Sequence, residues 1–429
     1  MRTVIAGGGV AGLAAARALR SRGLGCTILE GSGELGGLAC TDQAEGFSFD
    51  RTGHVLHFSR PEVRAEFEAL GVPLTRTERR AAVAVRDAVV PYPFQFNLWA
   101  LGDPGLARRA LEAARQAHAA RDPNPASFAG VLAGAWGETM ETLFFRPYNE
   151  KLWGRSLEEL PPDCAGDFLP DPQLPLVEEG IRGPTGYTGY NAHFLYPASG
   201  RLGDVVDALA RPLRAQVRLH STVASVDLER RTAATRDGRE FPFDHLISTM
   251  PLPALLAATK LPAPPAGILD ATSVGNVRVR IRGRMLSDLH WIYTPDPSVV
   301  FHRVGFPANL NPRTCPPGCI SLSVEHTIPR EGERREAREI AASAVEYLVR
   351  VGLIEVESWS AEEIVLSPAY VVWRAAGRPW FRETAEMLRE RGVVLAGRFG
   401  TWEYLSLEGA FASGMAAAEA VAGREVARV

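Results

Sequence analysis

Residues 3–12, Thr-Val-Ile-Ala-Gly-Gly-Gly-Val-Ala-Gly, decide the fold of this chain. An apolar run leads into Gly7-x-Gly9-x-x-Gly12, small apolar residues follow at helical spacing, and a second apolar run ends on Glu30. In a β-α-β unit the first glycine permits a tight turn, the second lets the backbone approach a pyrophosphate, and the third lets the helix pack on the strand. The helix N-terminus attracts phosphate, and the acid accepts hydrogen bonds from a ribose. The stretch predicts a dinucleotide-binding domain; the alternative is a glycine-rich turn without a ligand.

The composition is that of a globular protein with no general preference for nucleic acid or a membrane surface. Apolar residues make up 46% of the 429 residues, charged residues 23%, and the net charge is −3. No apolar run is long enough to span a bilayer, and we expect no signal peptide because the first strand begins at once. Five scattered cysteines indicate reduced thiols in a cytoplasm. Cys315-x-x-x-Cys319 has no second pair with which to hold a metal, so we expect no metal site. The sequence is compatible with a homo-oligomer and does not specify one.

The order of the patterns predicts an α/β protein whose domains are interleaved along the chain. Apolar runs that end on glycine return late in the sequence, after a helical region and a region of alternating apolar residues. We predict a Rossmann-like cofactor domain from residues 1–58, 198–250 and 392–429, a mainly helical substrate or cap domain from 59–197, and an antiparallel β-sheet substrate domain from 251–391.

Four local patterns give sharper expectations. The segment Phe49–Phe58 has the pattern of a strand. Ser127 has the side chain and the position to cap a helix that runs through Trp136, and the segment Phe145–Gly154 is expected to break this helical region. Asp237-Gly238 predicts a hairpin turn.

A second pair of glycines, Gly36-Gly37, lies directly behind the acidic strand and lets backbone amides reach another segment of a long cofactor. The two glycine motifs together resemble the flavoprotein superfamily of amine oxidases, protoporphyrinogen oxidases and sugar mutases. The resemblance implies that the dinucleotide is FAD, with His54 beside the flavin; a satisfied core histidine is the alternative. The cofactor-binding residues implied are Gly7, Gly9, Ala11, Gly12, Glu30, Gly36, Gly37, Leu38, His54, Val223, Gly397, Arg398, Gly409 and Ala410.

The segment Val90–Leu98 carries prolines at alternate positions, which forbid a regular strand ladder. It therefore presents Tyr92, Phe94 and Gln95 from a rigid loop. Such a loop suits stacking on a flat base, with the amide reading the base edge. A loop that packs domains together is the alternative.

Several short motifs resemble the UDP-galactopyranose mutases, the eukaryotic-type members more than the common bacterial ones. They are Tyr-Pro-Phe-Gln at 92–95, Pro-Tyr-Asn-x-Lys-x-Trp at 147–153, and Gly-Arg-Phe-Gly-x-Trp-x-Tyr at 397–404, in a resemblance that covers nearly the full length. The substrate-binding residues implied are Tyr92, Phe94, Gln95, Trp153, Asn191, Tyr293, Arg303, Tyr370 and Tyr404. The catalytic residues implied are His54, Arg303 and Tyr404.

The resemblance implies a flavin-dependent isomerase that interconverts the pyranose and furanose forms of a UDP-sugar, UDP-galactose or a variant. In that family N5 of reduced flavin attacks the anomeric carbon and displaces UDP, so the cofactor is the nucleophile. NAD(P)H is a candidate reductant. The protein must hold the departing diphosphate, which suits arginine and tyrosine, and it must exclude water.

The chain departs from that family at three positions. Phe168 lies near the place expected for a second arginine, Leu310 replaces a tyrosine, and Glu408 replaces an asparagine. Arg155 and Arg182 are the nearest substitutes for the missing arginine. Two alternatives therefore stay open: an FAD oxidase or desaturase of the amine oxidase or protoporphyrinogen oxidase type, and an FAD-binding relative that acts by interaction alone.

Overall fold

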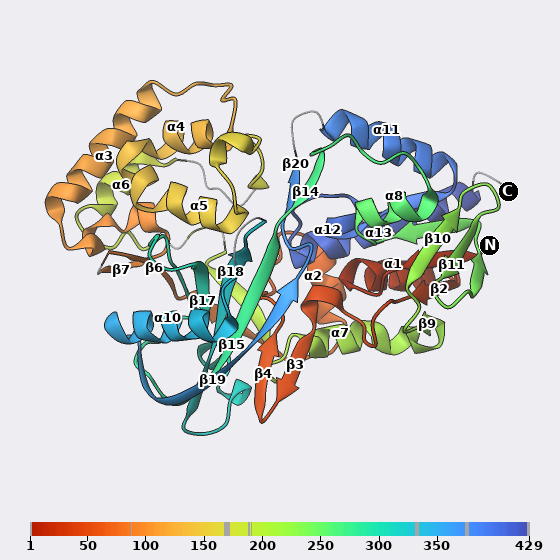
Figure 1. Ribbon diagram of the computed structural model, residues 1–429, viewed down its shortest axis with the longest axis horizontal. Coiled ribbons are helices and arrows are strands. Elements are labelled where there is room, and N and C mark those ends of the chain that lie inside the picture. The colour runs from red at the N-terminus through yellow and green to blue at the C-terminus, as the bar shows by residue number, and fades with distance from the viewer. Residues whose placement is uncertain are drawn as a thin grey trace.

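The glycine-rich stretch follows the central strand of a five-stranded parallel sheet, at the right of Figure 1. Strand β1 (Thr3–Ala6) lies between β13 (His245–Ser248) and β2 (Cys26–Leu29), with β21 (Val393–Leu395) and β9 (Val217–Arg218) at the two edges. The strands come from distant parts of the chain, which confirms an α/β fold with an interleaved cofactor domain. The computed structural model describes residues 2–86, 88–166, 172–187, 189, 191–330, 334–373 and 377–426.

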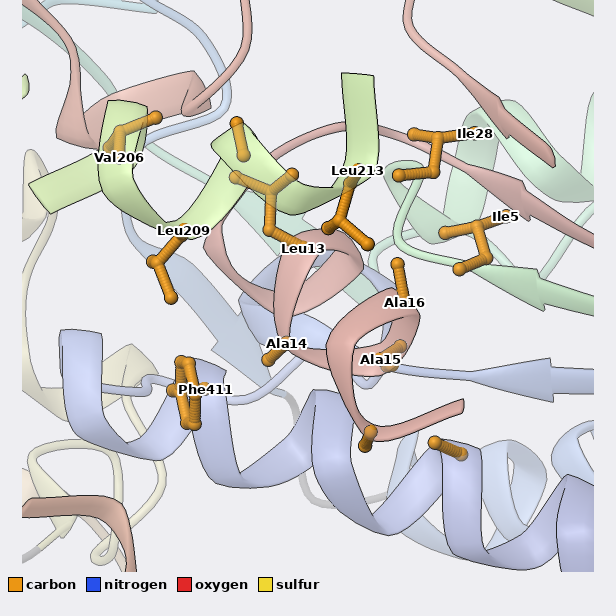
Figure 2. Close-up of a cluster of buried hydrophobic side chains, with 14 of the residues drawn as sticks. Ile5, Leu13, Ala14, Ala15, Ala16, Ile28, Val206, Leu209, Leu213 and Phe411 are labelled. Carbon is orange, nitrogen blue, oxygen red and sulfur yellow. The ribbon is translucent and has the colours of Figure 1, made fainter. Parts of the chain in front are cut away.

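Helix α1 (Val10–Ser21) packs between α7 (Gly203–Ala210) and α13 (Leu407–Val426), and Figure 2 shows the apolar side chains that meet there. Its alanines let the neighbouring helices approach closely. A Cβ added at Gly414 of α13 would lie 2.1 Å from the carbonyl oxygen of Ala11. This close packing fixes the direction of α1, whose N-terminus faces the ends of the parallel strands.

The second sheet has seven strands and includes two strands that the predicted helical segment 59–197 supplies. In order across the sheet they are β19 (Ile354–Leu366), β15 (Ser273–Met285), β18 (Cys319–Ile328), β17 (Phe301–Gly305), β16 (Trp291–Tyr293), β6 (Ala81–Val85) and β7 (Ala88–Pro91). Strand β6 pairs parallel with β16, and the other pairs are antiparallel. Helix α10 (Ala337–Arg350) packs against this sheet and shares a buried cluster with it.

The helical lobe at the upper left of Figure 1 contains α3 (Pro104–Ala119), α4 (Phe128–Met140), α5 (Arg146–Trp153) and α6 (Leu174–Gly180). Ser127 caps α4 as predicted, because its Oγ accepts a hydrogen bond from the amide of Gly130. The prediction that Phe145–Gly154 breaks the helical region is wrong. Pro147 lies in the first turn of α5, where a helix tolerates proline, and the helix ends at Gly154 with φ +63°.

The remaining elements connect these parts. The hairpins and small sheets are β3 (Thr41–Ala44) with β4 (Phe47–Asp50), β5 (Leu74–Glu78) with β8 (His193–Pro197), β10 (Val223–Asp227) with β11 (Thr232–Thr235) and β12 (Glu240–Pro242), and β14 (Leu269–Ala271) with β20 (Val371–Trp373). The other helices are α2 (Pro61–Glu68), α8 (Leu252–Thr259), α9 (Pro307–Leu310), α11 (Gly377–Glu390) and α12 (Gly397–Gly400).

The strand predicted for Phe49–Phe58 ends at Asp50, because the chain then leaves the hairpin to form a loop between the two large sheets. The turn predicted at Asp237-Gly238 joins β11 to β12, with Gly238 at φ +83°. Within the described residues, no helix combines the length and the apolar character that crossing a bilayer requires.

Candidate active site

A groove of about 740 Å³ lies along the ends of the parallel strands and the N-terminus of α1. No acidic side chain occupies the first turn of α1, so its free amides face the groove without a competing negative charge. A Cβ added at Gly9 would meet no atom of the described residues within 4 Å, which leaves the backbone open to a ligand there. The groove fits the pyrophosphate of a dinucleotide.

At the other glycines of the two motifs, contacts within the protein itself exclude a side chain. Gly7 has φ +109°, and a Cβ there would lie 2.0 Å from Thr249 Oγ1. A Cβ at Gly12 would lie 2.0 Å from the carbonyl oxygen of Gly7. Gly36, at φ +114°, donates its amide hydrogen to the carbonyl of Gly8 at 2.9 Å. The second glycine pair therefore packs directly on the first loop.

The structure brings most of the predicted cofactor residues to the groove. Those that line it are Gly7, Gly9, Ala11, Glu30, Gly36, Gly37, Leu38, His54, Val223, Gly397, Arg398 and Ala410. Gly12 and Gly409 do not line the groove. Gly12 packs against Gly7, and Gly409 donates its amide hydrogen to Ser406 Oγ, so both support residues that do line it. Glu30 accepts hydrogen bonds from the amides of Gly8 (2.7 Å) and Ser32 (2.8 Å), which holds the glycine turn.

A second cavity of about 320 Å³ meets the groove at five shared residues. These are Leu38, His54, Arg398, Ser406 and Leu407. The predicted substrate residues that line this cavity are Tyr92, Gln95, Trp153, Asn191, Tyr293, Arg303, Tyr370 and Tyr404. Phe94 does not share this position: its ring is fully buried and packs on Phe144, so it supports the loop from the core of the helical lobe.

Arg303 is one of two arginines that line this cavity, and Glu325 is its partner. The Arg303 guanidinium donates two hydrogen bonds to the Glu325 carboxylate, at 3.0 and 2.5 Å. Glu325 also accepts the amide hydrogen of Gly53 at 3.3 Å. Sequence reasoning missed Glu325 because it lies within a run of alternating strand residues. Its only signal is its register opposite Arg303, which becomes visible once β17 and β18 are paired.

A group of tyrosines surrounds Arg303. The ring centroids of Tyr148 and Tyr293 are 5.3 Å apart, those of Tyr92 and Tyr293 5.5 Å, and those of Tyr370 and Tyr404 5.4 Å. Burial raises the pKa of Tyr92, Tyr148, Tyr370 and Tyr404 above the usual value. Their hydroxyls therefore stay protonated and can donate hydrogen bonds to an anion.

His54 lies where the two cavities meet. Its Nδ1 contacts Thr52 Oγ1. Burial, together with the positive charges of Arg398 and Arg303, lowers the pKa of His54 to about 3. The imidazole is therefore neutral at physiological pH and adds no charge to either cavity.

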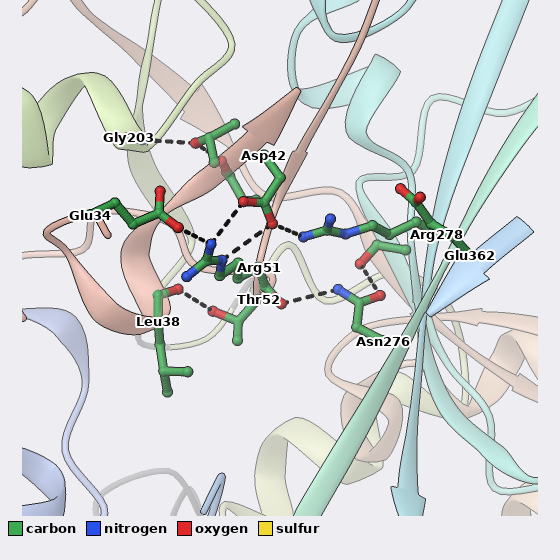
Figure 3. A network of polar contacts seen from close by, with 12 residues as sticks. Glu34, Leu38, Asp42, Arg51, Thr52, Gly203, Asn276, Arg278 and Glu362 are labelled. Carbon is green, nitrogen blue, oxygen red and sulfur yellow. Dashed lines mark hydrogen bonds and ion pairs between the residues drawn. The ribbon is translucent and has the colours of Figure 1, made fainter. Parts of the chain in front are cut away.

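A polar network fixes the loop that carries His54 between the two large sheets (Figure 3). Arg51 and Arg278 both bind the carboxylate of Asp42, so the hairpin β3–β4 is tied to β15. Asn276 donates to the carbonyl of Arg51 at 3.1 Å, and Thr52 Oγ1 donates to the carbonyl of Leu38 at 3.4 Å. The network sets the position of one domain against the other at the junction of the cavities.

Arg398 is a second guanidinium that lines both cavities. It donates to the carbonyl of Leu405 at 3.0 and 2.5 Å and to that of Ala369 at 3.3 Å. Neither of the expected substitutes reaches the cavity lining: Arg155 pairs with Asp270 at 2.5 Å, and Arg182 pairs with Glu178 on the surface. The Phe168 position lies outside the described residues.

The Glu408 carboxylate faces backbone as well as the cavity. It accepts hydrogen bonds from the amides of Ser59 (2.9 Å) and Arg60 (2.7 Å) and from Ser59 Oγ (2.9 Å). These donors compensate its negative charge and anchor the loop before α2. Leu310 lies at the end of α9 and lines a smaller cavity behind Arg303.

Several buried polar atoms in the substrate cavity have no hydrogen-bond partner among the residues that the structure describes. They are Trp153 Nε1, Asn191 Oδ1, Trp291 Nε1 and both ring nitrogens of His302. Buried polar groups are normally paired, so these atoms point to a polar ligand. Among the described residues, no three His, Cys, Asp or Glu side chains gather in a way that could hold a metal ion.

Comparison with known proteins identifies the family. The model of the flavin-containing amine oxidoreductase family matches residues 10–422. The chain belongs to this family. The groove described above fits its flavin dinucleotide, and the chain is a flavoprotein of the amine oxidase superfamily.

Individual relatives share either the whole fold or a short sequence. A solved structure of reduced UDP-galactopyranose mutase superposes with a TM-score of 0.89 at 23% identity, over 99% of this chain and 96% of that chain, so the fold is shared along the whole length. Two curated relatives match only a short stretch: protoporphyrinogen oxidase 2 of Arabidopsis thaliana, 37% identical over 71 residues, and pseudooxynicotine dehydrogenase of a Pseudomonas species, 36% identical over 74 residues. These stretches span 17% of this chain and 14% and 15% of the two relatives.

Proposed function

We propose that this protein is an FAD-dependent mutase that interconverts the pyranose and furanose forms of a UDP-sugar. The observation that carries the proposal is the placement of Arg303 among partly buried tyrosines, in a cavity that opens onto the cofactor groove beside His54. The shared fold with a protein titled UDP-galactopyranose mutase supports the same reading.

The charges of the cavity suit a nucleotide diphosphate. Arg303 and Arg398 supply two permanent positive charges, and the protonated tyrosine hydroxyls supply neutral donors. Arginine and hydroxyl groups bind phosphate oxygens in this way. Glu325 pairs with Arg303, and a diphosphate offers the guanidinium further acceptors.

The remaining lining residues suit the two ends of such a substrate. Tyr92 and Tyr293 offer ring faces to a nucleobase, and Gln95, almost fully buried, offers an amide to its edge. Asn191 Oδ1, which has no hydrogen-bond partner among the described residues, suits a sugar hydroxyl. The reaction also requires that water be excluded from the reacting sugar. Reduced FAD supplies the nucleophile in this proposal.

The decisive assay uses the FAD-loaded enzyme reduced with dithionite and incubated with UDP-galactopyranose and other UDP-sugars. A furanose product that forms only with reduced enzyme supports the proposal. Rapid oxygen consumption on an amine or a porphyrinogen, without any change of the flavin spectrum on adding UDP, would instead establish the oxidase alternative that the short sequence matches favour.

Arg303→Ala tests the binding role. We expect UDP to bind about 100-fold more weakly, because a partly buried charged hydrogen-bond partner is removed, while FAD stays bound. Arg80→Ala is the matched control, since Arg80 pairs with Asp288 on the surface. An Arg303→Ala enzyme that binds UDP like the parent would contradict the proposed site.

A further inference from the structure

His302 is a buried histidine whose function the site described above does not explain. Its side chain is 1% exposed, and neither ring nitrogen has a hydrogen-bond partner among the described residues. It lines the substrate cavity. An unpaired buried polar group costs about 1–3 kcal/mol of stability. Packing alone therefore gives no reason for an imidazole at this position.

A β-bulge points His302 at the cavity. On β17, Phe301 pairs with His326 and Arg303 pairs with Glu325, so His302 is an extra residue between two consecutive pairs. In a regular strand, neighbouring side chains point to opposite faces. Here Phe301 is buried in the sheet's core while both His302 and Arg303 line the cavity. Bulges beside active sites redirect side chains in this way.

The neighbours of His302 place it toward the aromatic part of the cavity. Its ring lies edge-on to Tyr148, with centroids 6.4 Å apart, and Tyr148 in turn contacts Tyr293. Tyr293 contacts Tyr92, the first residue of the loop that carries Gln95. His302 therefore lies between the diphosphate-binding arginine and the aromatic rings proposed to hold the base.

The imidazole is neutral in this setting. Burial, reinforced by the positive charges of Arg303 and Lys151 and by the neighbouring His326, holds the pKa of His302 well below its usual value. A neutral imidazole has one N–H donor and one free acceptor nitrogen. The pair matches a sugar hydroxyl, which can both accept and donate, and its N–H alone suits the carbonyl of a pyrimidine base, which accepts.

We propose that His302 contacts the substrate and hydrogen-bonds the nucleoside half of the nucleotide-sugar, at a ribose hydroxyl or a uracil carbonyl. The inference rests on the proposed function, because it assumes that a uridine nucleotide binds in this cavity. It assigns His302 to specificity for the nucleoside, separate from the contact of Arg303 with the diphosphate.

The test compares the affinities of UDP and UMP for the FAD-loaded enzyme, followed through the flavin spectrum. We expect His302→Phe to weaken both ligands about tenfold and by the same factor, because the lost contact is on the nucleoside. His302→Asn keeps a donor and an acceptor and should recover part of the affinity. With 2′-deoxy-UDP the effect of His302→Phe disappears if the partner is the ribose 2′-hydroxyl, and it persists if the partner is another group of the nucleoside.

Thermal unfolding separates this role from a structural one. Replacing an unpaired imidazole with Phe should leave the Tm of ligand-free enzyme unchanged or higher, whereas a structural histidine would lose stability. His290→Phe is the control: His290 is also fully buried, and its Nε2 has no partner in the described part of the chain, but it lies outside the substrate cavity, so its replacement should not change UDP affinity.

The outcomes also separate this inference from the proposed function. UDP affinity unchanged in both His302 variants, with Arg303→Ala impaired, overturns the role of His302 alone. A larger loss for UDP than for UMP would place the contact on the diphosphate and overturn it as well. A parent enzyme that binds no UDP overturns the proposed function itself.

Discussion

The cofactor groove and the substrate cavity meet at His54 but are built in different ways. The groove is formed largely by backbone, with glycines where a side chain would obstruct the ligand or a neighbouring strand. The cavity is formed by side chains from distant segments, including Tyr92, Trp153, Arg303 and Tyr404. This difference explains why the groove can be predicted from local sequence, whereas the cavity can be recognised only once the sheets and the helical lobe are assembled.

The largest effect should come from Gly12→Val, which disrupts the cofactor groove. A Cβ at Gly12 would lie 2.0 Å from the carbonyl oxygen of Gly7, so the loop and α1 must separate. We expect purified protein with FAD occupancy, measured by flavin absorbance per chain, reduced to near zero.

Two alanine variants sharpen this result. The methyl group of Gly9→Ala meets no atom within 4 Å in the described part of the chain, so the variant should fold normally but bind FAD at least tenfold more weakly, because the methyl group occupies ligand space. Gly25→Ala, equally free of contacts, should change neither property. Normal FAD affinity in Gly9→Ala would contradict the assignment of the pyrophosphate to this loop.

The next largest effect tests whether the cavity depends on charge in the way the groove depends on shape. Glu325→Gln removes the partner of Arg303 and should lower the free energy of unfolding by about 3 kcal/mol in urea denaturation, because a mostly buried guanidinium loses its counter-charge. The same change should strengthen UDP binding several-fold, since a carboxylate no longer repels the diphosphate. Weaker UDP binding would show that Glu325 acts mainly by orienting Arg303.

The contrast also explains how much the sequence could predict. The β-α-β unit, the late return of Gly397 and the interleaved domains follow from patterns that are local in sequence. The role of Phe94 does not follow from local sequence. The sequence shows that Phe94 lies in an aromatic loop, but whether its ring faces a ligand or the core depends on Phe144, which lies in another helix. Glu325 and His302 depend on the pairing and the bulge between β17 and β18, which no single strand encodes.

The same reasoning applies to the departures from the mutase motifs. Glu408 in isolation suggests repulsion of a diphosphate, but its environment is a set of amide donors from residues almost 350 positions earlier in the chain. The second positive charge of the cavity comes from Arg398, which the sequence assigned to the cofactor, and Arg155 is committed to Asp270. A departure from a family motif is therefore weak evidence about function until the partners of the new residue are known.

Glu408→Ala measures how much these hydrogen bonds contribute to stability. The loss of three hydrogen bonds to Ser59 and Arg60 should destabilise the protein by about 2 kcal/mol, because two backbone amides lose a charged acceptor. Urea denaturation gives the value, and Glu403→Ala, at an exposed position nearby, is the control with an expected change below about 0.5 kcal/mol. Stability equal to that of the control would show that water replaces the carboxylate without cost.

The smallest effect tests the boundary between the two regions. The pKa of His54 is about 3 in the folded protein, below the value of 6.5 expected for an unfolded chain. Between these values the unfolded state binds a proton that the folded state does not, so His54 makes the protein less stable as the pH falls below about 6.5. His54→Gln should therefore reduce the loss of unfolding free energy between pH 7.5 and 5.5 by about 1 kcal/mol.

The measurement is urea denaturation of the FAD-loaded protein at the two pH values, with the exposed His118→Gln as control. If His54→Gln leaves the pH dependence as it is in the parent, the imidazole takes up a proton in the folded state. That result would mean that water reaches His54, and the junction would then lack the dry surroundings that a reaction protected from hydrolysis requires.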